Sequence, residues 1–125
     1  MPDRLEDLVA RIPEEWGKEI RFGEGWDEIV TDLDRDLKQI FPSYVIHQMK
    51  EKFGILRFYW GSGESDPNPV KIAAADEIVE AAHAKSAVTC EMCGESGSPC
   101  KPNGFWLRTL CEKCAQEAKN VRWVP

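Results

Sequence analysis

Two Cys-x-x-Cys pairs near the end of the sequence constrain its fold more than any other feature. The first pair reads Cys90-Glu-Met-Cys93, and the second, Cys111-Glu-Lys-Cys114, follows after seventeen residues. This spacing is typical of structural zinc sites, because Zn²⁺ prefers four ligands in a tetrahedron and binds thiolates well. Four thiolates complete that shell and leave no position for water or substrate. The motif therefore predicts a structural Zn²⁺ ion that stabilises the fold, and not a catalytic centre.

Disulfide bonds and a redox or other metal site are the alternatives for these cysteines. The chain has five cysteines, an odd number. Residues 1–8 lack the apolar run of a signal peptide, and no stretch approaches the roughly 18 apolar residues of a membrane span. We therefore expect a cytoplasmic protein that is not membrane-bound, and in a reducing compartment such pairs bind metal more often than they form disulfides. Cys100, the fifth cysteine, is expected to be a spare thiol, with a ligand or a reactive thiol as alternatives.

The charge of the chain is acidic and uneven. Its 22 acidic and 16 basic side chains give a net charge of −6. Residues 1–42 alone carry twelve acids and six bases. Four thiolates with one Zn²⁺ would bring the net charge to about −8. Such a surface repels a phosphate backbone and attracts a basic protein.

The spacing of apolar residues predicts four elements in residues 1–89. We expect a helix over 3–12 with Asp3 as its cap, a helix over 26–41, a β-hairpin over 43–60 and an Ala-rich helix over 70–85. On the second helix, acids including Asp32, Asp34 and Asp36 are predicted to face solvent. Strict alternation along the first strand places Tyr44, Ile46, Gln48 and Lys50 on one face. The expected buried side of the last helix comprises Val70, Ala74, Ile78, Ala81 and Ala82.

The hairpin turn is predicted at Lys52-Phe53-Gly54, because glycine readily supplies a positive φ. In its second strand, Leu56, Phe58 and Trp60 are expected to share one face. Residues 61–69 are rich in glycine, proline and serine, which predicts a loop.

The zinc segment predicts a further hairpin and a final helix. Its arms are expected at 99–101 and 105–110, with the turn at 102–104 and the helix at 114–119; residues 121–125 are expected to pack on the body. A Cys-x-x-Cys turn, a hairpin and a second pair at a helix start follow the order of a treble clef. The fold class is therefore α+β, with a body over 1–89 and a zinc-binding module over 90–125 packed on it.

The string Lys50-Glu-Lys-Phe-Gly54, followed by Leu56-Arg-Phe-Tyr59 and later by Cys90-x-x-Cys93, is similar to a group of small, uncharacterised bacterial and phage proteins. In these proteins a KEKFGxLRFY hairpin precedes a C-terminal treble-clef-like module whose last zinc ligand is Cys or His. The resemblance covers roughly residues 20–118 and implies the same architecture and a bacterial or phage origin. It implies no catalytic residues.

Catalytic motifs are weak in this sequence. His47 and His83 are the only histidines, and each is expected to be a partly exposed or hydrogen-bonded side chain, with a metal ligand or a general base as the alternative. Gly61-Ser-Gly63 lacks the lysine of a phosphate-binding loop and is interpreted as a connector. An enzyme, most plausibly built around His47, stays a third hypothesis behind the two binding functions below.

A basic and aromatic cluster on the hairpin and acids on the second helix are the candidate partner-binding residues. They are Lys50, Lys52, Phe53, Arg57, Tyr59, Trp60, Asp32 and Asp36. The aromatic residues can also form the sheet core while the bases extend into solvent. We interpret the chain as a zinc-stabilised protein-binding factor of adaptor, inhibitor or immunity type, with a partner that can be basic. The alternative is a nucleic-acid-binding zinc protein that uses Lys101, Arg108, Lys113, Lys119 and Arg122.

Overall fold

A computed structural model describes residues 5–18, 20–102, 104 and 106–119 and shows the predicted α+β fold. The helices are α1 (Glu6–Val9), α2 (Asp27–Ile40), α3 (Pro69–Ser86) and α4 (Glu112–Lys119), with short 3₁₀ turns at Glu14–Trp16 and Glu24–Trp26. The strands are β1 (Val45–Lys52), β2 (Ile55–Gly61), β3 (Ser98–Cys100) and β4 (Arg108–Leu110). α1 is shorter than predicted, and its proposed cap Asp3 and the tail 121–125 lie outside the described residues.

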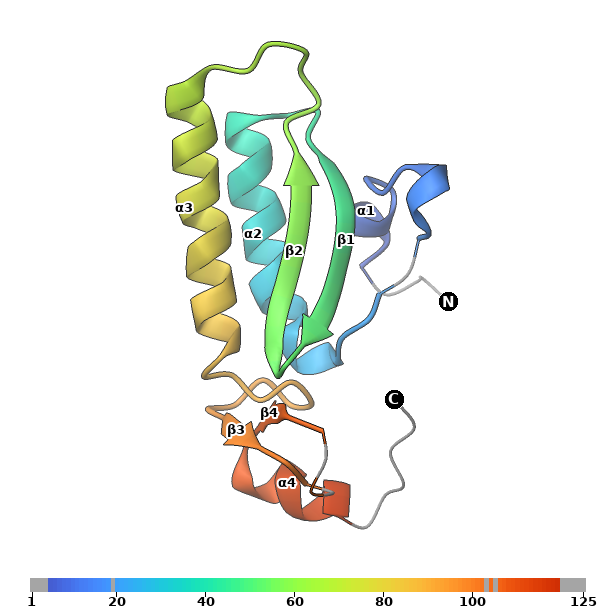
Figure 1. Cartoon of the computed structure of the whole chain (residues 1–125), viewed down its shortest axis with the longest axis vertical. Coiled ribbons are helices and arrows are strands. Elements are labelled where there is room, and N and C mark those ends of the chain that lie inside the picture. The colour runs from blue at the N-terminus through green and yellow to red at the C-terminus, as the bar shows by residue number, and fades with distance from the viewer. Residues whose placement is uncertain (1–4, 19, 103, 105, 120–125) are drawn as a thin grey trace.

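The β1–β2 hairpin is the centre of the body (Figure 1). α2 lies behind it, α3 runs beside β2, and α1 lies on the β1 side, while β3, β4 and α4 gather at the end that holds the hairpin turn. The main core lies between the hairpin and the helices. Its largest fully buried side chains are Trp26, Tyr44, Phe41, Ile12, Leu37, Ile46, Met49 and Leu56.

The α2 helix forms where its apolar stripe predicted it. Ile29, Val30, Leu33 and Leu37 recur at three- and four-residue spacing, and all four are buried. Acids in the first turn and Lys38 in the last complement the helix dipole. The helix is therefore stabilised both by packing on the hairpin and by its own end charges.

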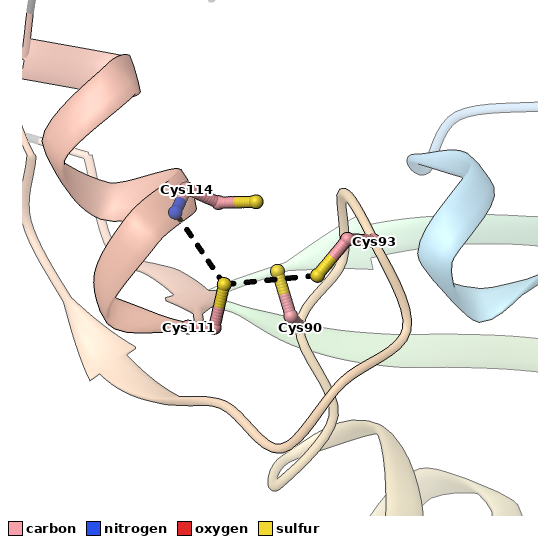
Figure 2. Close-up of side chains that lie close together, drawn as sticks. All are labelled: Cys90, Cys93, Cys111 and Cys114. Carbon is pink, nitrogen blue, oxygen red and sulfur yellow. Dashed lines mark hydrogen bonds between the residues drawn. The ribbon is translucent and has the colours of Figure 1, made fainter.

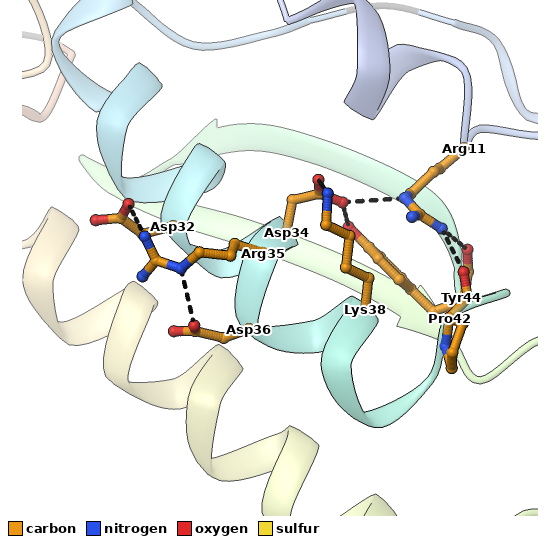
Figure 3. A network of polar contacts seen from close by, with 8 residues as sticks. All are labelled: Arg11, Asp32, Asp34, Arg35, Asp36, Lys38, Pro42 and Tyr44. Atoms are coloured by element: carbon orange, nitrogen blue, oxygen red, sulfur yellow. Dashed lines mark hydrogen bonds and ion pairs between the residues drawn. The ribbon is translucent and has the colours of Figure 1, made fainter.

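Asp34 was predicted to face solvent, and the structure shows that this is wrong. The residue is 5% exposed, and its carboxylate accepts a hydrogen bond from the Tyr44 hydroxyl and forms an ion pair with Arg11 Nε at 3.0 Å (Figure 3). Arg11 also donates to the Tyr44 carbonyl at 3.1 Å and lies over the Tyr44 ring. Burial, then the hydrogen bond from its hydroxyl to Asp34, raise the pKa of Tyr44. The network joins the N-terminal segment, α2 and the start of β1.

The hairpin turn is confirmed, but the alternation predicted for β1 is wrong. Phe53 and Gly54 have φ values of 56° and 79°, as a tight hairpin turn requires. The register shifts between Ile46 and Gln48. An extra residue in one strand reverses the faces that follow it. Met49 is therefore buried in place of Gln48 and Lys50.

The α3 helix packs through a face that only partly matches the predicted one. Ala82 is buried and Ile78 packs partly buried against the core, as predicted. Ala75, Val79 and Ser86 are also buried, whereas Val70 is 77% exposed and Ala74 and Ala81 face solvent. Two polar groups of α3 bind the backbone of β2. The Ser86 hydroxyl accepts from Leu56 N at 2.8 Å, and His83 Nε2 accepts from Phe58 N at 3.1 Å. Burial lowers the pKa of His83, which favours the neutral ring that this bond needs.

Replacing Asp34 with alanine should destabilise the fold by about 2–4 kcal/mol, because it leaves Arg11 and the Tyr44 hydroxyl without their partner. The matched control is Asp32→Ala, which removes an exposed ion pair with Arg35 and should cost no more than about 0.5 kcal/mol. Chemical denaturation of both variants measures the difference. Equal costs would show that the Asp34 network does not contribute to stability.

Candidate metal centre

The four predicted cysteines come together in one cluster. The sulfur atoms of Cys90, Cys93, Cys111 and Cys114 all lie within 4.8 Å of one another, and none forms a disulfide (Figure 2). Cys93 Sγ and Cys111 Sγ are 3.6 Å apart. A tetrahedral zinc ion with Zn–S bonds of about 2.3 Å requires sulfurs about 3.8 Å apart. The cluster therefore has the dimensions of a four-thiolate site that can hold a metal ion.

Each pair is shaped by local backbone hydrogen bonds. In the first, Gly94 N donates to the Cys90 carbonyl at 2.9 Å, and Gly94 has the φ of 85° that this turn needs. In the second, Cys111 directly precedes α4, and Cys114 N donates to Cys111 Sγ at 3.4 Å. Both turns therefore direct their sulfur atoms into one cluster.

The thiols of the cluster differ in their acidity. Burial raises the pKa of Cys90, but backbone N–H groups around it outweigh this effect and bring the pKa to about 7. Burial, followed by hydrogen bonds with the neighbouring thiols, raises the pKa of Cys114. Four neighbouring sulfurs cannot all carry a negative charge unless a cation compensates them. The cluster therefore gains most from a divalent metal ion, whose binding releases the remaining protons.

Cys100 lies outside the four-thiol cluster, on the short hairpin that the sequence predicted. It pairs with Arg108 between β3 and β4 and packs beside the buried residues Cys90, Leu110 and Ala118. β3 has the predicted length but begins one residue earlier, and β4 is shorter than predicted, while Gly104 has the positive φ of a turn residue. The position shows that Cys100 does not belong to the cluster of four, and its role as a spare thiol stays a prediction.

Glu91 is the main polar contact between the cluster and the body, although it lies between two metal-site cysteines. Its carboxylate is 2% exposed. One oxygen accepts from Gly23 N at 2.8 Å, and the other accepts from Arg108 Nε at 2.9 Å and Nη2 at 2.8 Å. Burial raises the pKa of Glu91, while the Arg108 charge opposes the shift. Arg108 was predicted as a candidate nucleic-acid contact, but the structure buries it in this pair.

Backbone contacts complete the docking of the cluster. Gly25 N donates to the Glu91 carbonyl at 2.7 Å, and Glu91 N donates to the Thr109 carbonyl at 2.9 Å. The Trp26 indole N–H donates to the Thr89 carbonyl at 2.9 Å. On the hairpin side, the Thr109 hydroxyl donates to the Gly54 carbonyl. The segment before α2 therefore binds the first Cys-x-x-Cys turn, and the turn of the β1–β2 hairpin binds β4.

Sequence reasoning did not identify Glu91, Gly23 or Gly25 as parts of this interface. A Cβ atom at Gly25 would lie 2.2 Å from the Cys90 carbonyl oxygen, and one at Gly23 would lie 2.5 Å from that of Glu91. Only glycine allows such close approach of two backbones. Gly23 and Gly25, which precede α2, could have indicated a close approach of another backbone. Their spacing does not indicate which segment approaches them.

The predicted partner-binding residues fall into separate places. Lys50, Lys52, Arg57 and Tyr59 lie on the hairpin face opposite the core, and Phe53 is 66% exposed at the turn. Trp60 instead packs against the core, with its ring centroid 5.8 Å from that of Phe41.

Asp32 and Asp36 are both bound by one arginine. Arg35 pairs with them at 3.1 and 3.3 Å (Figure 3). The acids of α2 therefore offer less unpaired negative charge than the sequence predicted.

Comparison with known proteins gave no match to a family model, a curated protein or a solved structure. The resemblance of residues 50–59 to small bacterial and phage proteins stays a prediction. Within the described residues, none of the helices is long and apolar enough to cross a membrane.

A methyl group at Gly25 should separate the cluster from the body. Gly25→Ala is expected to destabilise the protein by about 3 kcal/mol, because the Cβ meets backbone atoms that cannot rotate away. Gly104→Ala is the control: its Cβ meets nothing within 4 Å, so only its positive φ costs about 1 kcal/mol. Denaturation curves compare the two, and a Gly25 variant as stable as the Gly104 variant would contradict the proposed docking.

Proposed function

We propose that the chain is a small zinc-stabilised factor that binds another protein as an adaptor, an inhibitor or an immunity-type factor, and that it has no catalytic set of its own. The metal has a structural role in this proposal. The four cysteines supply a complete shell, so an ion held by them keeps no position for a substrate. Binding then depends on surfaces outside the metal centre.

Zinc is the metal that the ligand set favours. Four soft thiolate ligands in a tetrahedral arrangement are typical of zinc or of iron and iron–sulfur centres. The order of a Cys-x-x-Cys turn, a β-hairpin and a second pair at the start of α4 supports a treble-clef-like zinc module. The small apolar cluster beside the sulfurs includes only Cys90, Leu110 and Ala118 as buried residues among those described. A core of that size needs a metal ion to be stable.

The exposed aromatic tip of the hairpin is the observation that carries the binding function. Phe53 is 66% exposed and has a φ of 56°. Holding a non-glycine residue in this region costs about 1–2 kcal/mol, and Asn or Gly is preferred at such turns. Trp106 is 43% exposed, and its indole N–H donates to Glu51 at 3.3 Å. Exposed and positioned aromatic side chains are typical of protein-binding hot spots.

Nucleic-acid binding is supported less well. Arg108 is buried against Glu91 and cannot reach a phosphate. The four thiolates with Zn²⁺ would also add about two negative charges beside the remaining bases. An acidic chain repels a polyanion. We therefore propose a protein as the partner. We expect the chain to act in the cytoplasm.

Native mass spectrometry should find one zinc ion per chain. Cys90→Ser should lose the ion and unfold residues 90–119, because a ligand is removed from the shell. Cys100→Ser is the control and should retain the ion, since its sulfur lies outside the cluster. Bound iron, or a metal-free wild-type protein that is fully folded, would contradict the zinc assignment.

Affinity purification from the cells that encode the chain tests the binding function. The zinc-loaded protein is expected to recover one partner in stoichiometric amount. A Phe53→Asn variant should recover at least about tenfold less, since the aromatic anchor is lost while the turn is better accommodated. Val70→Asn, at a position of α3 that is 77% exposed, is the control and should recover the partner as the wild-type chain does. If repeated purifications recover no partner, the proposed function is wrong.

A further inference from the structure

The face of the β1–β2 hairpin that points away from α2 carries no described helix. In Figure 1 the hairpin lies in front of α2, between α3 and α1, and its near face is uncovered. Leu56 and Phe58 are buried on the far face, so the alternate residues of β2 belong to the near one. The cross-strand pairs on this open face are Gln48 with Tyr59, Lys50 with Arg57, and Lys52 with Ile55.

The open face is a basic surface on an acidic chain. Three of its six residues are cations, none is an acid, and Lys50 lies directly opposite Arg57. Like charges placed opposite each other destabilise a hairpin. Within the described residues, neither Lys50, Lys52 nor Arg57 forms an ion pair. Glu51, the nearest acid in sequence, is directed elsewhere and accepts from Gly54 N at 2.7 Å.

The side chain of Arg57 has an unused donor. Its Nε atom is buried and has no hydrogen-bond partner among the described residues. A buried donor without an acceptor destabilises the free protein. Because Nε has no exposed surface, a carboxylate from another molecule would reach the guanidinium through its terminal nitrogens. Arg57 as a whole is intermediate in exposure, so an anionic group from another molecule can pair with its charge at this point.

The edges of the hairpin are already occupied, so a partner is expected to contact its face. On β2, Leu56 N and Phe58 N donate to the side chains of α3. On β1, Ile46 N donates to the Arg11 carbonyl and Glu51 N to the Arg21 carbonyl. Addition of a strand needs free backbone groups at an edge. Recognition must therefore use the side chains of the open face.

We propose that the open face binds an acidic segment of the partner protein. Carboxylates of that segment pair with Lys50 and Arg57, and apolar side chains contact Tyr59, which is 45% exposed, and Phe53 at the turn. A nucleic acid would bring its phosphates against the whole acidic chain, whereas a short segment meets only this basic face. The inference rests on the proposed protein-binding function, and it replaces the basic partner expected from the sequence with a partner that carries an acidic segment.

A short fluorescein-labelled peptide that alternates glutamate with leucine is the probe, measured by fluorescence anisotropy with the zinc-loaded chain. The double variant Lys50→Glu/Arg57→Glu should weaken binding by at least about tenfold. Lys71→Glu/Lys85→Glu, which changes the charge equally on exposed positions of α3, should change affinity less than about twofold. Amide NMR shifts caused by the peptide should map to residues 48–59.

Several outcomes would overturn the inference. One is that the glutamate–leucine peptide does not bind, and another is that a lysine–leucine peptide binds with the same affinity. A third is that the Lys71→Glu/Lys85→Glu variant loses as much affinity for the glutamate–leucine peptide as the Lys50→Glu/Arg57→Glu variant does. A fourth is that a single-stranded oligonucleotide binds more tightly than the glutamate–leucine peptide. A dimer in sedimentation runs that the double variant abolishes would assign the face to a second copy of the chain. If the double variant misfolds by circular dichroism, Arg57→Gln provides the comparison, because it removes the fork and adds no charge repulsion.

Affinity purification separates this inference from the function on which it rests. If the wild-type chain recovers a partner and the Lys50→Glu/Arg57→Glu variant recovers the same amount, the partner does not bind at the open face, and the proposed binding function is still supported. If the wild-type chain recovers no partner, the binding function itself fails. An acidic segment found in the partner, whose deletion weakens binding as much as the double variant does, supports both.

Discussion

The buried carboxylate of Glu91 is the interaction on which the arrangement of the molecule depends. It lies between two cysteines of the metal site, yet it binds the backbone of Gly23 and the guanidinium of Arg108. A buried carboxylate is stable only when its partners are in place. The four-thiol cluster, the segment before α2 and strand β4 are therefore positioned together by one side chain.

The metal ion in this account stabilises the position of Glu91. The apolar cluster near the sulfurs is small, whereas the main core beneath the hairpin contains seventeen buried residues among those described. The body can therefore fold largely by burying apolar surface, but the Cys90–Cys93 turn needs its ligand. Gly54 of the hairpin turn accepts a hydrogen bond from Thr109 of β4, which lies two residues before Cys111. An ion bound by the cluster would therefore also stabilise the hairpin turn that contains Phe53.

Local patterns in the sequence predicted the parts of the structure that depend on neighbouring residues. The apolar stripe of α2, the Phe53–Gly54 turn and the cysteine spacing each specify their own geometry. The errors arose where a distant contact decided the outcome. Asp34 is buried because Arg11 and Tyr44 reach it, Met49 faces the core because of an irregular register, and α3 is apolar on more than one side. No local pattern indicates the pairing of Glu91 with Arg108.

Amide hydrogen exchange on the zinc-loaded and the chelator-treated protein tests the central claim most directly. If the metal fixes Glu91 and Glu91 fixes the body segment, removal of zinc should abolish protection at Gly23, Gly25 and Glu91. Protection at Leu56 and Phe58, whose N–H groups are bound by α3, should persist. Unchanged protection at Gly23 and Gly25 after complete loss of the metal would contradict the account, because the interface would then form without it.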